Sequence, residues 1–214
     1  MAKKKIKLKP SSDFVGLLTE DGATSSGIDT DSGVIGIKTP NKFTFSVGGD
    51  DPHGVFGVVK AGKNLTWTYS LDNDNPEVDA LALGQGLSQL YQITIKAKGY
   101  KTIKEKVSIT IEGRNDAPEI TSNEETSVGE GTEAVLILAA TDVDFGASLN
   151  YSIVDDLDAD FFEIVDTANG PELRFKDPSI SDDVPYLVKV RATDEFGAFD
   201  EQEIAVTVNP ADIL

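Results

Sequence analysis

The sequence predicts an all-β protein that consists of two tandem Greek-key β-sandwiches joined end to end. Strand-length segments with alternating polar and apolar residues recur along the chain, separated by Gly, Asp, Asn and Pro. The balance of charge changes sharply near residue 116. Each half also ends with an alternating strand followed by Asn and Pro, at residues 107–118 and 204–210, which indicates two related modules.

Both halves contain segments with the alternation expected of strands. They are residues 42–47, 66–71, 91–96 and 107–111 in the first half, and 135–138, 149–153, 186–192 and 204–208 in the second. In the segment 66–71, Trp67, Tyr69 and Leu71 share one face, which predicts that they belong to a core.

One short helix and one surface turn are predicted in the first half. Asn75 can cap a helix, Pro76 suits its first position, and Gly84 can end it. The single histidine, His53, follows Asp and Pro in a turn, which predicts a surface position and no catalytic role.

The two halves differ in charge. Through Asp116 the chain has 15 basic and 14 acidic residues, whereas from Ala117 onward it has 4 and 23, a net charge of −19. This asymmetry supports a domain boundary and argues against nucleic acid as a partner. The predicted limits are a disordered basic lead at 1–12, a sandwich at 13–113, a linker at 114–117, a sandwich at 118–209 and a tail at 210–214.

The composition limits how the protein can be stabilised and where it can act. Because cysteine is absent, neither disulfides nor thiolate metal sites are possible, and a secreted protein of this kind needs another source of stability, such as bound metal. No apolar run approaches the roughly 18 residues of a membrane span. The charged N-terminus lacks a signal-peptide core, which leaves a cytoplasmic protein, a fragment, or export by a signal elsewhere.

Acidic residues and asparagine gather at predicted strand ends. The groups are Glu20 with Asp21, Asp72 with Asp74, Asn115 with Asp116, Asp142 with Asp144, and Asp194. Two carboxylates about 5 Å apart repel by roughly 3 kcal/mol at an effective dielectric of about 20, so several that converge require a cation. Calcium accepts about 6–8 oxygens in flexible geometry, whereas zinc prefers nitrogen and sulfur. Each group alone is more typical of a solvated turn than of a metal site.

The order of these motifs resembles two known repeat families. Residues 118–209 resemble a bacterial cadherin-like domain. The motifs that carry this resemblance are Glu130-Gly131, the run 140–146 (Ala-Thr-Asp-Val-Asp-Phe-Gly) and the run 190–197 (Val-Arg-Ala-Thr-Asp-Glu-Phe-Gly). The first half resembles a VCBS repeat, through the runs 65–73 and 75–81 and the Asn-Asp-Ala-Pro ending at 115–118. Such repeats occur in large, secreted, calcium-dependent RTX-type surface adhesins that act in biofilms. The resemblance implies Ig-like or cadherin-like sandwiches at the bacterial cell surface.

The resemblance also implies one calcium cluster, at the joint between the halves. Its ligands would be Glu20, Asp72, Asp74, Asn115, Asp116, Asp142, Asp144 and Asp194. The first half lacks the Asp-x-Asp and the later Asp that would hold calcium at its N-terminal edge, where residues 35–44 and 96–101 stand instead. The second half ends in Asn209-Pro210 without the full Asn-Asp pair, so no second site is expected there.

The function implied is that of a structural extender or stalk segment, rigidified by calcium. The expected partners are calcium ions, neighbouring adhesin domains and possible surface glycans or proteins, with no nucleic acid, no membrane span and a monomeric chain. The alternatives are a calcium-dependent module that binds a glycan or peptide, and an accessory β-domain pair of a secreted hydrolase. No enzyme is expected, because thiol nucleophiles, nucleophile elbows and phosphate-binding loops are absent from the sequence.

Two charged loops allow two interpretations each. The lysine-rich hairpin at 96–106 is either a solvated turn or a contact for an acidic partner, including the acidic half of a neighbouring molecule. The acidic loop at 155–160 is either a solvated turn or a peripheral calcium site.

Overall fold

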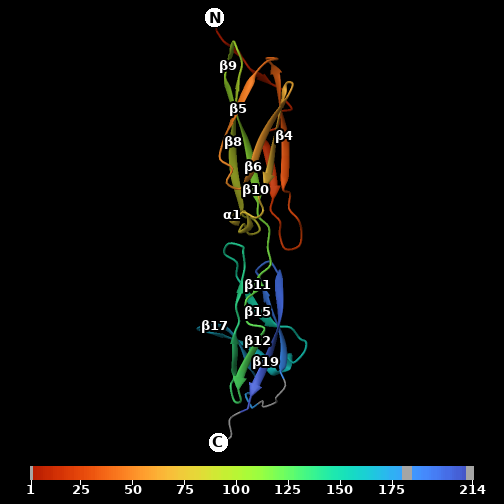
Figure 1. Cartoon of the computed structure of the whole chain (residues 1–214), viewed down its shortest axis with the longest axis vertical. Helices are drawn as coiled ribbons and strands as arrows, with labels where there is room; N and C mark the ends of the chain where they lie inside the picture. The colour runs from red at the N-terminus through yellow and green to blue at the C-terminus, as the bar shows by residue number, and fades with distance from the viewer. Residues whose placement is uncertain (1, 180–184, 211–214) are drawn as a thin grey trace. The chain divides into compact units, whose positions relative to one another are not determined.

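The computed structural model describes residues 2–179 and 185–210. The chain divides into two compact units, Met1–Asn115 and Asp116–Leu214, and each has its own core. Almost all of the regular structure is β-strand, as the ribbon shows (Figure 1). The all-β fold with two sandwich units is therefore confirmed. No helix in the described ranges is long and apolar enough to cross a membrane.

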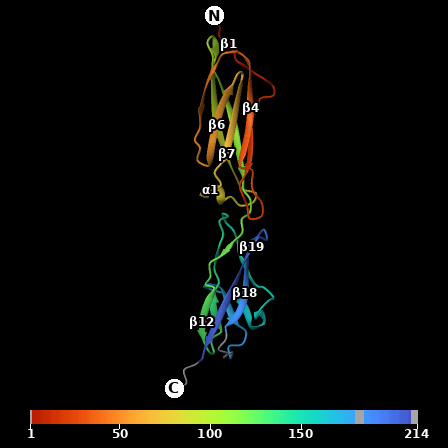
Figure 2. The same ribbon diagram turned by 45° about the vertical axis from the view of Figure 1, so that its right-hand side comes forward.

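The first unit is a sandwich of two four-stranded sheets. One sheet has the order β3 (Val15–Thr19), β10 (Ile103–Glu112), β8 (Gly86–Lys96) and β5 (Thr44–Gly48). The other has the order β2 (Lys7–Leu8), β4 (Thr30–Thr39), β7 (Asn64–Leu71) and β6 (Gly54–Ala61). A small parallel pair, β1 (Lys4–Lys5) with β9 (Tyr100–Lys101), lies at the N-terminal end of this unit, and α1 (Pro76–Asp79) lies at the other end (Figures 1 and 2).

The second unit is built in a similar way from shorter strands. Its main sheet has the order β12 (Glu125–Gly129), β19 (Phe199–Asn209), β18 (Tyr186–Thr193) and β15 (Asn150–Ile153), part of which is clear in Figure 2. The facing strands are β13 (Ala134–Ile137), β17 (Gly170–Phe175) and β16 (Phe162–Thr167). A two-stranded pair joins β11 (Glu119–Ile120) to β14 (Ala140–Thr141), and η1 (Ala159–Phe161) precedes β16.

An early strand lies parallel to the last strand in both units. In the first unit β3 pairs with β10 in parallel, and in the second β12 pairs with β19 in parallel. All other neighbours within the main sheets are antiparallel. This shared pairing supports the prediction that the two modules are related, because the ending that repeats in the sequence follows β10 in one unit and lies at the end of β19 in the other.

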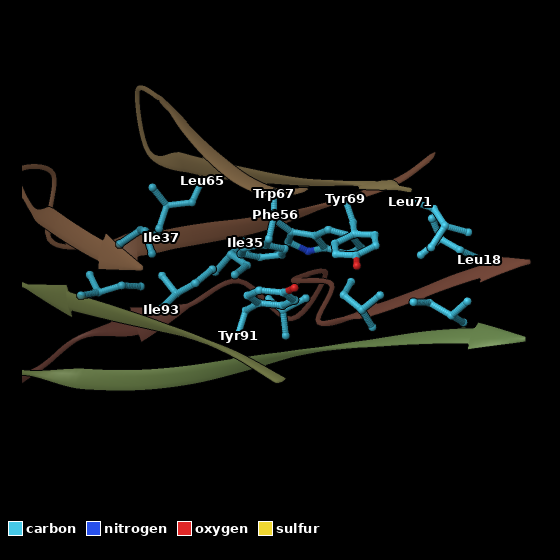
Figure 3. Packing of buried hydrophobic residues seen from close by; sticks show 14 of the residues in the cluster. Leu18, Ile35, Ile37, Phe56, Leu65, Trp67, Tyr69, Leu71, Tyr91 and Ile93 are labelled. Atoms are coloured by element: carbon cyan, nitrogen blue, oxygen red, sulfur yellow. The ribbon is translucent and has the colours of Figure 1, made fainter. Parts of the chain in front are cut away.

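Trp67 organises the core of the first unit. Its ring is fully buried between the two sheets, next to Phe56 (Figure 3), and its Nε1 donates a hydrogen bond to the carbonyl oxygen of Asp13 at 3.0 Å. Phe56 in turn stacks on Tyr91 with ring centroids 4.0 Å apart. Gly33 on β4 leaves room for the indole, since a Cβ there would lie 2.5 Å from Trp67 Cε2. The indole thus requires a residue without a side chain on the neighbouring strand.

The second unit has a smaller aromatic core. Phe162 and Phe175 stack with their centroids 4.6 Å apart, and Tyr186 meets Phe175 edge-on at 5.5 Å. Aliphatic residues of β18 and β19 complete this core, including Val188, which is fully buried. The unit therefore has a hydrophobic centre that is separate from that of Trp67.

Most of the predicted local structure is confirmed. Each predicted strand segment overlaps a strand, and Trp67, Tyr69 and Leu71 are buried together as expected. Asn75 caps α1, accepting a hydrogen bond from Glu77 N at 2.9 Å, although the helix ends at Asp79, well before Gly84.

Two predictions were wrong. The lead was expected to be disordered, but β1 and β2 lie within it and Ile6 is buried, because the sequence Lys-Ile-Lys-Leu-Lys alternates as a strand does. His53 was expected on the surface, but it is buried: its ring nitrogens lie 2.5 Å from Gln89 Nε2 and 2.8 Å from Glu77 Oε2. Both partners are supplied by other segments of the unit, which a local turn pattern does not reveal.

Candidate functional site

Glu20 is held inside the first unit, beside the end of that unit's chain. It directly follows β3 and is only 1% exposed. Its Oε1 accepts a hydrogen bond from Arg114 N at 2.5 Å, and its own backbone N–H donates to Glu112 O at 3.2 Å. A buried carboxylate that receives a backbone N–H keeps a fixed position. Glu20 is therefore fixed against the segment that leads to the boundary of the unit.

The loop after Glu20 wraps around the same segment. The carbonyl oxygen of Asn115 accepts a hydrogen bond from Ala23 N at 3.0 Å, and the Arg114 guanidinium donates to Ser25 Oγ at 2.6 Å. Gly22 permits this approach, because a Cβ there would lie 2.9 Å from Arg114 Cβ. The predicted linker residue Asn115 is thus held by the first unit through its backbone.

Asn73, which lies between the predicted ligands Asp72 and Asp74, contacts two acids of the first unit. Its Nδ2 donates to Asp29 Oδ1 at 3.1 Å and to Asp21 Oδ2 at 3.4 Å. Asp72 and Asp74 are both exposed. In a turn, the backbone N–H of Asp72 donates a hydrogen bond to His53 O at 3.0 Å, and the Asp72 C=O accepts one from Asn75 N at 3.2 Å. The side chain of Asn73 therefore contacts Asp21 and Asp29, whereas those of Asp72 and Asp74 are exposed.

In the second unit, Asp142 and Asp144 form a chain of hydrogen bonds with Asp116. Asp144 Oδ2 accepts from Asp116 N at 2.9 Å, and Asp142 Oδ1 accepts from Asp144 N at 3.0 Å. Each carboxylate uses one oxygen in this way. Among the described residues, the other oxygens, Asp142 Oδ2 and Asp144 Oδ1, are buried and have no hydrogen-bond partner. Buried carboxylate oxygens of this kind are costly unless a cation or a donor reaches them.

Asp194 is placed by a tight turn after β18. Its Oδ1 accepts hydrogen bonds from the backbone N–H groups of three successive residues, Phe196, Gly197 and Ala198, at 2.6–2.9 Å. Gly197 has a φ of 92°, which favours glycine at this position. The carboxylate is 5% exposed, so Asp194 is a second buried acid of this unit, on a fixed turn.

The charges of these acids act on one another. Burial raises the pKa of Asp144, and the charges of Asp142, Asp194 and Glu195 raise it further against the lowering effect of the hydrogen bond from Asp116 N. Burial also raises the pKa of Asp142, with further contributions from Asp194 and Glu195. A raised pKa means that the ionised form is disfavoured, so the folded protein would gain from a nearby positive charge.

The acidic loop at 155–160 does not converge in the same way. Asp156 Oδ2 lies 3.2 Å from Lys189 Nζ, and Asp158 Oδ2 accepts a hydrogen bond from Leu187 N at 2.9 Å. The side chain of Asp160 is exposed. These contacts favour the interpretation of a structural turn, in which the acids fasten the loop to β18.

The fold matches solved structures of cadherin domains. The human mucin-like protocadherin EC1-2 fragment matches with a TM-score of 0.54 and 16% identity, over 97% of this chain and 100% of that one. Protocadherin gamma C5 EC1-3 matches with a TM-score of 0.59 and 16% identity, over 95% and 68% of the two chains. The fold is cadherin-like.

Other cadherin structures agree, and sequence comparisons add nothing further. Protocadherin gamma B2 extracellular domains 3-6 match with a TM-score of 0.58 and 14% identity, over 95% of this chain and 47% of that one. The cadherin-like chain thus spans about half the length of such longer structures. No protein-family profile and no curated protein matches the sequence.

The ligand set that the sequence predicts lacks three residues of the cadherin-like first unit, Asn73, Asp21 and Asp29. Asn73 contacts both Asp21 and Asp29. Asp29 directly precedes β4, so its position at a strand end was a signal available in the sequence. The contact between Asp29 and Asn73 could not be predicted, because β4 shows little polar–apolar alternation and the strand that follows Asp29 was therefore not predicted.

Proposed function

We propose that this chain is a structural segment of an extracellular calcium-dependent adhesin, in which calcium at the joint between the two units makes the segment rigid. The observation that carries the proposal is the pair of buried oxygens, Asp142 Oδ2 and Asp144 Oδ1, which have no hydrogen-bond partner among the described residues. The resemblance to VCBS and bacterial cadherin-like repeats extends the proposal to a bacterial surface adhesin of the RTX type.

The donor set fits calcium better than other common metals. All of the candidate ligands are carboxylate, amide or carbonyl oxygens, which calcium and magnesium prefer. Magnesium requires a near-ideal octahedron, whereas calcium accepts irregular sets of about 6–8 oxygens. When bound, calcium would supply the positive charge that the buried acids of the second unit lack.

The covalent chain supports ligands from both units. The Glu20 carboxylate accepts a hydrogen bond from Arg114 N, and the Asp144 carboxylate accepts one from Asp116 N. Arg114 and Asp116 are separated by only one residue, so their nitrogens are at most about 7 Å apart in any conformation. One ion could therefore be reached by carboxylates that belong to different units.

The proposed ligands are a revised form of the set expected from the sequence. Glu20, Asn115, Asp116, Asp142, Asp144 and Asp194 remain proposed ligands. In the first unit we propose Asn73 and Asp21 in place of Asp72 and Asp74, because Asn73 Nδ2 contacts Asp21 and the two predicted acids are exposed. Calcium would require the amide of Asn73 to present its oxygen, which a rotation of the amide achieves.

The proposed mechanism is electrostatic. Without calcium, the ionised acids repel one another and the linker at 114–117 becomes flexible, because single hydrogen bonds hold Asn115 O and Asp116 N. With calcium, the same carboxylates are attracted to a common centre, which fixes the direction in which one unit follows the other. The role is mechanical, and no step of a chemical reaction is proposed.

The comparison structures are consistent with this role. Several are described as extracellular cadherin domains. At 13–16% identity they support the fold, and the extracellular location of this chain is part of the proposal.

Small-angle scattering tests the proposal. We expect the maximum dimension of the chain to increase, and its flexibility to decrease, when calcium replaces a chelator. The chelated sample measured in magnesium is the control, because magnesium should not rigidify the chain to the same extent. If calcium leaves both quantities unchanged, the stalk function is wrong, and a calcium-dependent ligand-binding module becomes the better explanation of the acidic residues.

A further inference from the structure

The first unit has a lysine-rich end with few acidic residues, of which Glu105 on β10 is one. Residues 1–12, 33–49, 54–71 and 80–104 contain 13 lysines and no Asp or Glu. These lysines lie on or next to β1, β2 and β9, at the starts of β5 and β10, and at the adjoining ends of β4, β6 and β8, at the N-terminal end of the unit (Figures 1 and 2). We call this surface the basic end. Most acids of the unit lie at the opposite end, around Glu20 and α1.

The basic end is not neutralised within its own unit. All 13 lysines are exposed, and none of them lies within 4.0 Å of a carboxylate in the part of the chain that the structure describes. In the β1–β9 pair, Lys5 is directly opposite Lys101. Like charges directly opposite each other destabilise a strand pair. A local conflict of this kind is typical of a surface that serves function rather than stability.

The basic end also has a shaped surface. Lys42, Lys96 and Lys98 surround a hollow of about 350 Å³ whose remaining wall is formed by Phe43, Thr44 and Ala97. The ring of Phe43 is held in place by Lys60, whose Nζ lies 3.9 Å from the ring centroid and 2.6 Å from the Phe43 carbonyl oxygen. A partner that presents acidic side chains would therefore meet both positive charge and a recess that a protruding side chain can enter.

The second unit carries a matching acidic surface. Glu124, Glu125, Glu201 and Glu203 line a groove of about 480 Å³ across β12 and β19, together with Gln202 and Ala205. We call this surface the acidic groove. Glu201 pairs with Arg191, but the other three glutamates are exposed and form no ion pair among the described residues. The groove belongs to the half of the chain whose net charge is −19 from Ala117 onward.

We propose that the basic end of one molecule binds the acidic groove of another molecule of the same chain. Because the two surfaces are different, the contact is heterologous and leaves an unused basic end and an unused acidic groove on every pair. The association therefore continues into open chains. Opposite fields of this size also accelerate encounter and align the partners, and both effects decrease with salt.

Charge reversal on both surfaces tests this proposal. We expect sedimentation velocity to show self-association of the full chain that weakens at least about tenfold between about 0.01 M and about 1 M NaCl, at constant free calcium. K42E/K96E/K98E and E124K/E125K/E203K should each remain monomeric at low salt. An equimolar mixture of the two variants should associate again, because each then supplies the surface complementary to the other.

The controls separate this contact from a general effect of charge. D155K/D160K/E163K changes the net charge as much as the acidic-groove variant, at exposed positions elsewhere in the second unit, and should associate like the wild type. Circular dichroism checks that each variant is folded. The proposal is overturned if both reversal variants associate normally, or if their mixture stays monomeric. It is also overturned if the wild type stays monomeric at low salt, and binding of heparin to its basic end would then assign this surface to an anionic polysaccharide.

Discussion

Asp144→Asn is expected to remove the calcium-dependent rise in melting temperature. At calcium concentrations about 100-fold above the dissociation constant, one site that binds only the folded state adds about 2.7 kcal/mol of stability. For a unit of about 100 residues this corresponds to a shift of about 10–20 °C. The asparagine can still accept the hydrogen bond from Asp116 N, so the local structure should be kept while the charge is lost.

The same variant has a second signature in chelator. Because burial and neighbouring charges disfavour ionised Asp144, removing its charge should leave the metal-free protein as stable as the wild type, or more stable. Differential scanning calorimetry with calcium and with chelator measures both effects. Asp160→Asn, an exposed matched substitution, should keep the full response to calcium. A normal calcium response in Asp144→Asn would remove Asp144 from the proposed ligand set.

Trp67→Ala is expected to destabilise the first unit alone. Truncation of a fully buried tryptophan costs about 3–5 kcal/mol, because the lost burial is combined with a cavity between the sheets. The hydrogen bond to Asp13 O is also lost. Since the second unit has a separate core around Phe162 and Phe175, its unfolding transition in chelator should be unchanged.

Calorimetry in chelator follows the two transitions separately. The control is Val59→Ala on β6, an exposed position where the change should be within about 0.5 kcal/mol. If Trp67→Ala lowers both transitions equally, the two units do not fold independently, contrary to what their separate cores imply.

Strands with one buried face could be predicted from the sequence, and strands rich in glycine could not. β7 alternates because Trp67 and Tyr69 face the core while their neighbours face outward. β4 was not predicted, because Gly33 and Gly36 occupy positions where a larger residue would give the alternation. Those glycines are required by partners from elsewhere in the chain: the Trp67 ring and the side chain of Lys9. Such a requirement cannot be inferred from local pattern.

The candidate site could be predicted only in part, for the same reason. Asp142 and Asp144 follow β14 with one residue between them, and this spacing predicts that both carboxylates lie on one side. The turn after β7 decides which member of the run 72–74 contacts Asp21 and Asp29. In this turn the backbone of Asp72 is hydrogen-bonded to His53 and Asn75. That turn depends on the burial of His53 by Gln89 on β8, a contact between distant segments.

The most direct test of the central claim is a calorimetric calcium titration of Glu20→Gln, Asp144→Asn and the double variant. If both units supply ligands to one ion, each single variant should lose the same binding event, and the double variant should lose nothing further. Asp160→Asn should retain all binding events. If Glu20→Gln and Asp144→Asn remove different binding events, or if neither changes the titration, calcium does not join the two units through these carboxylates.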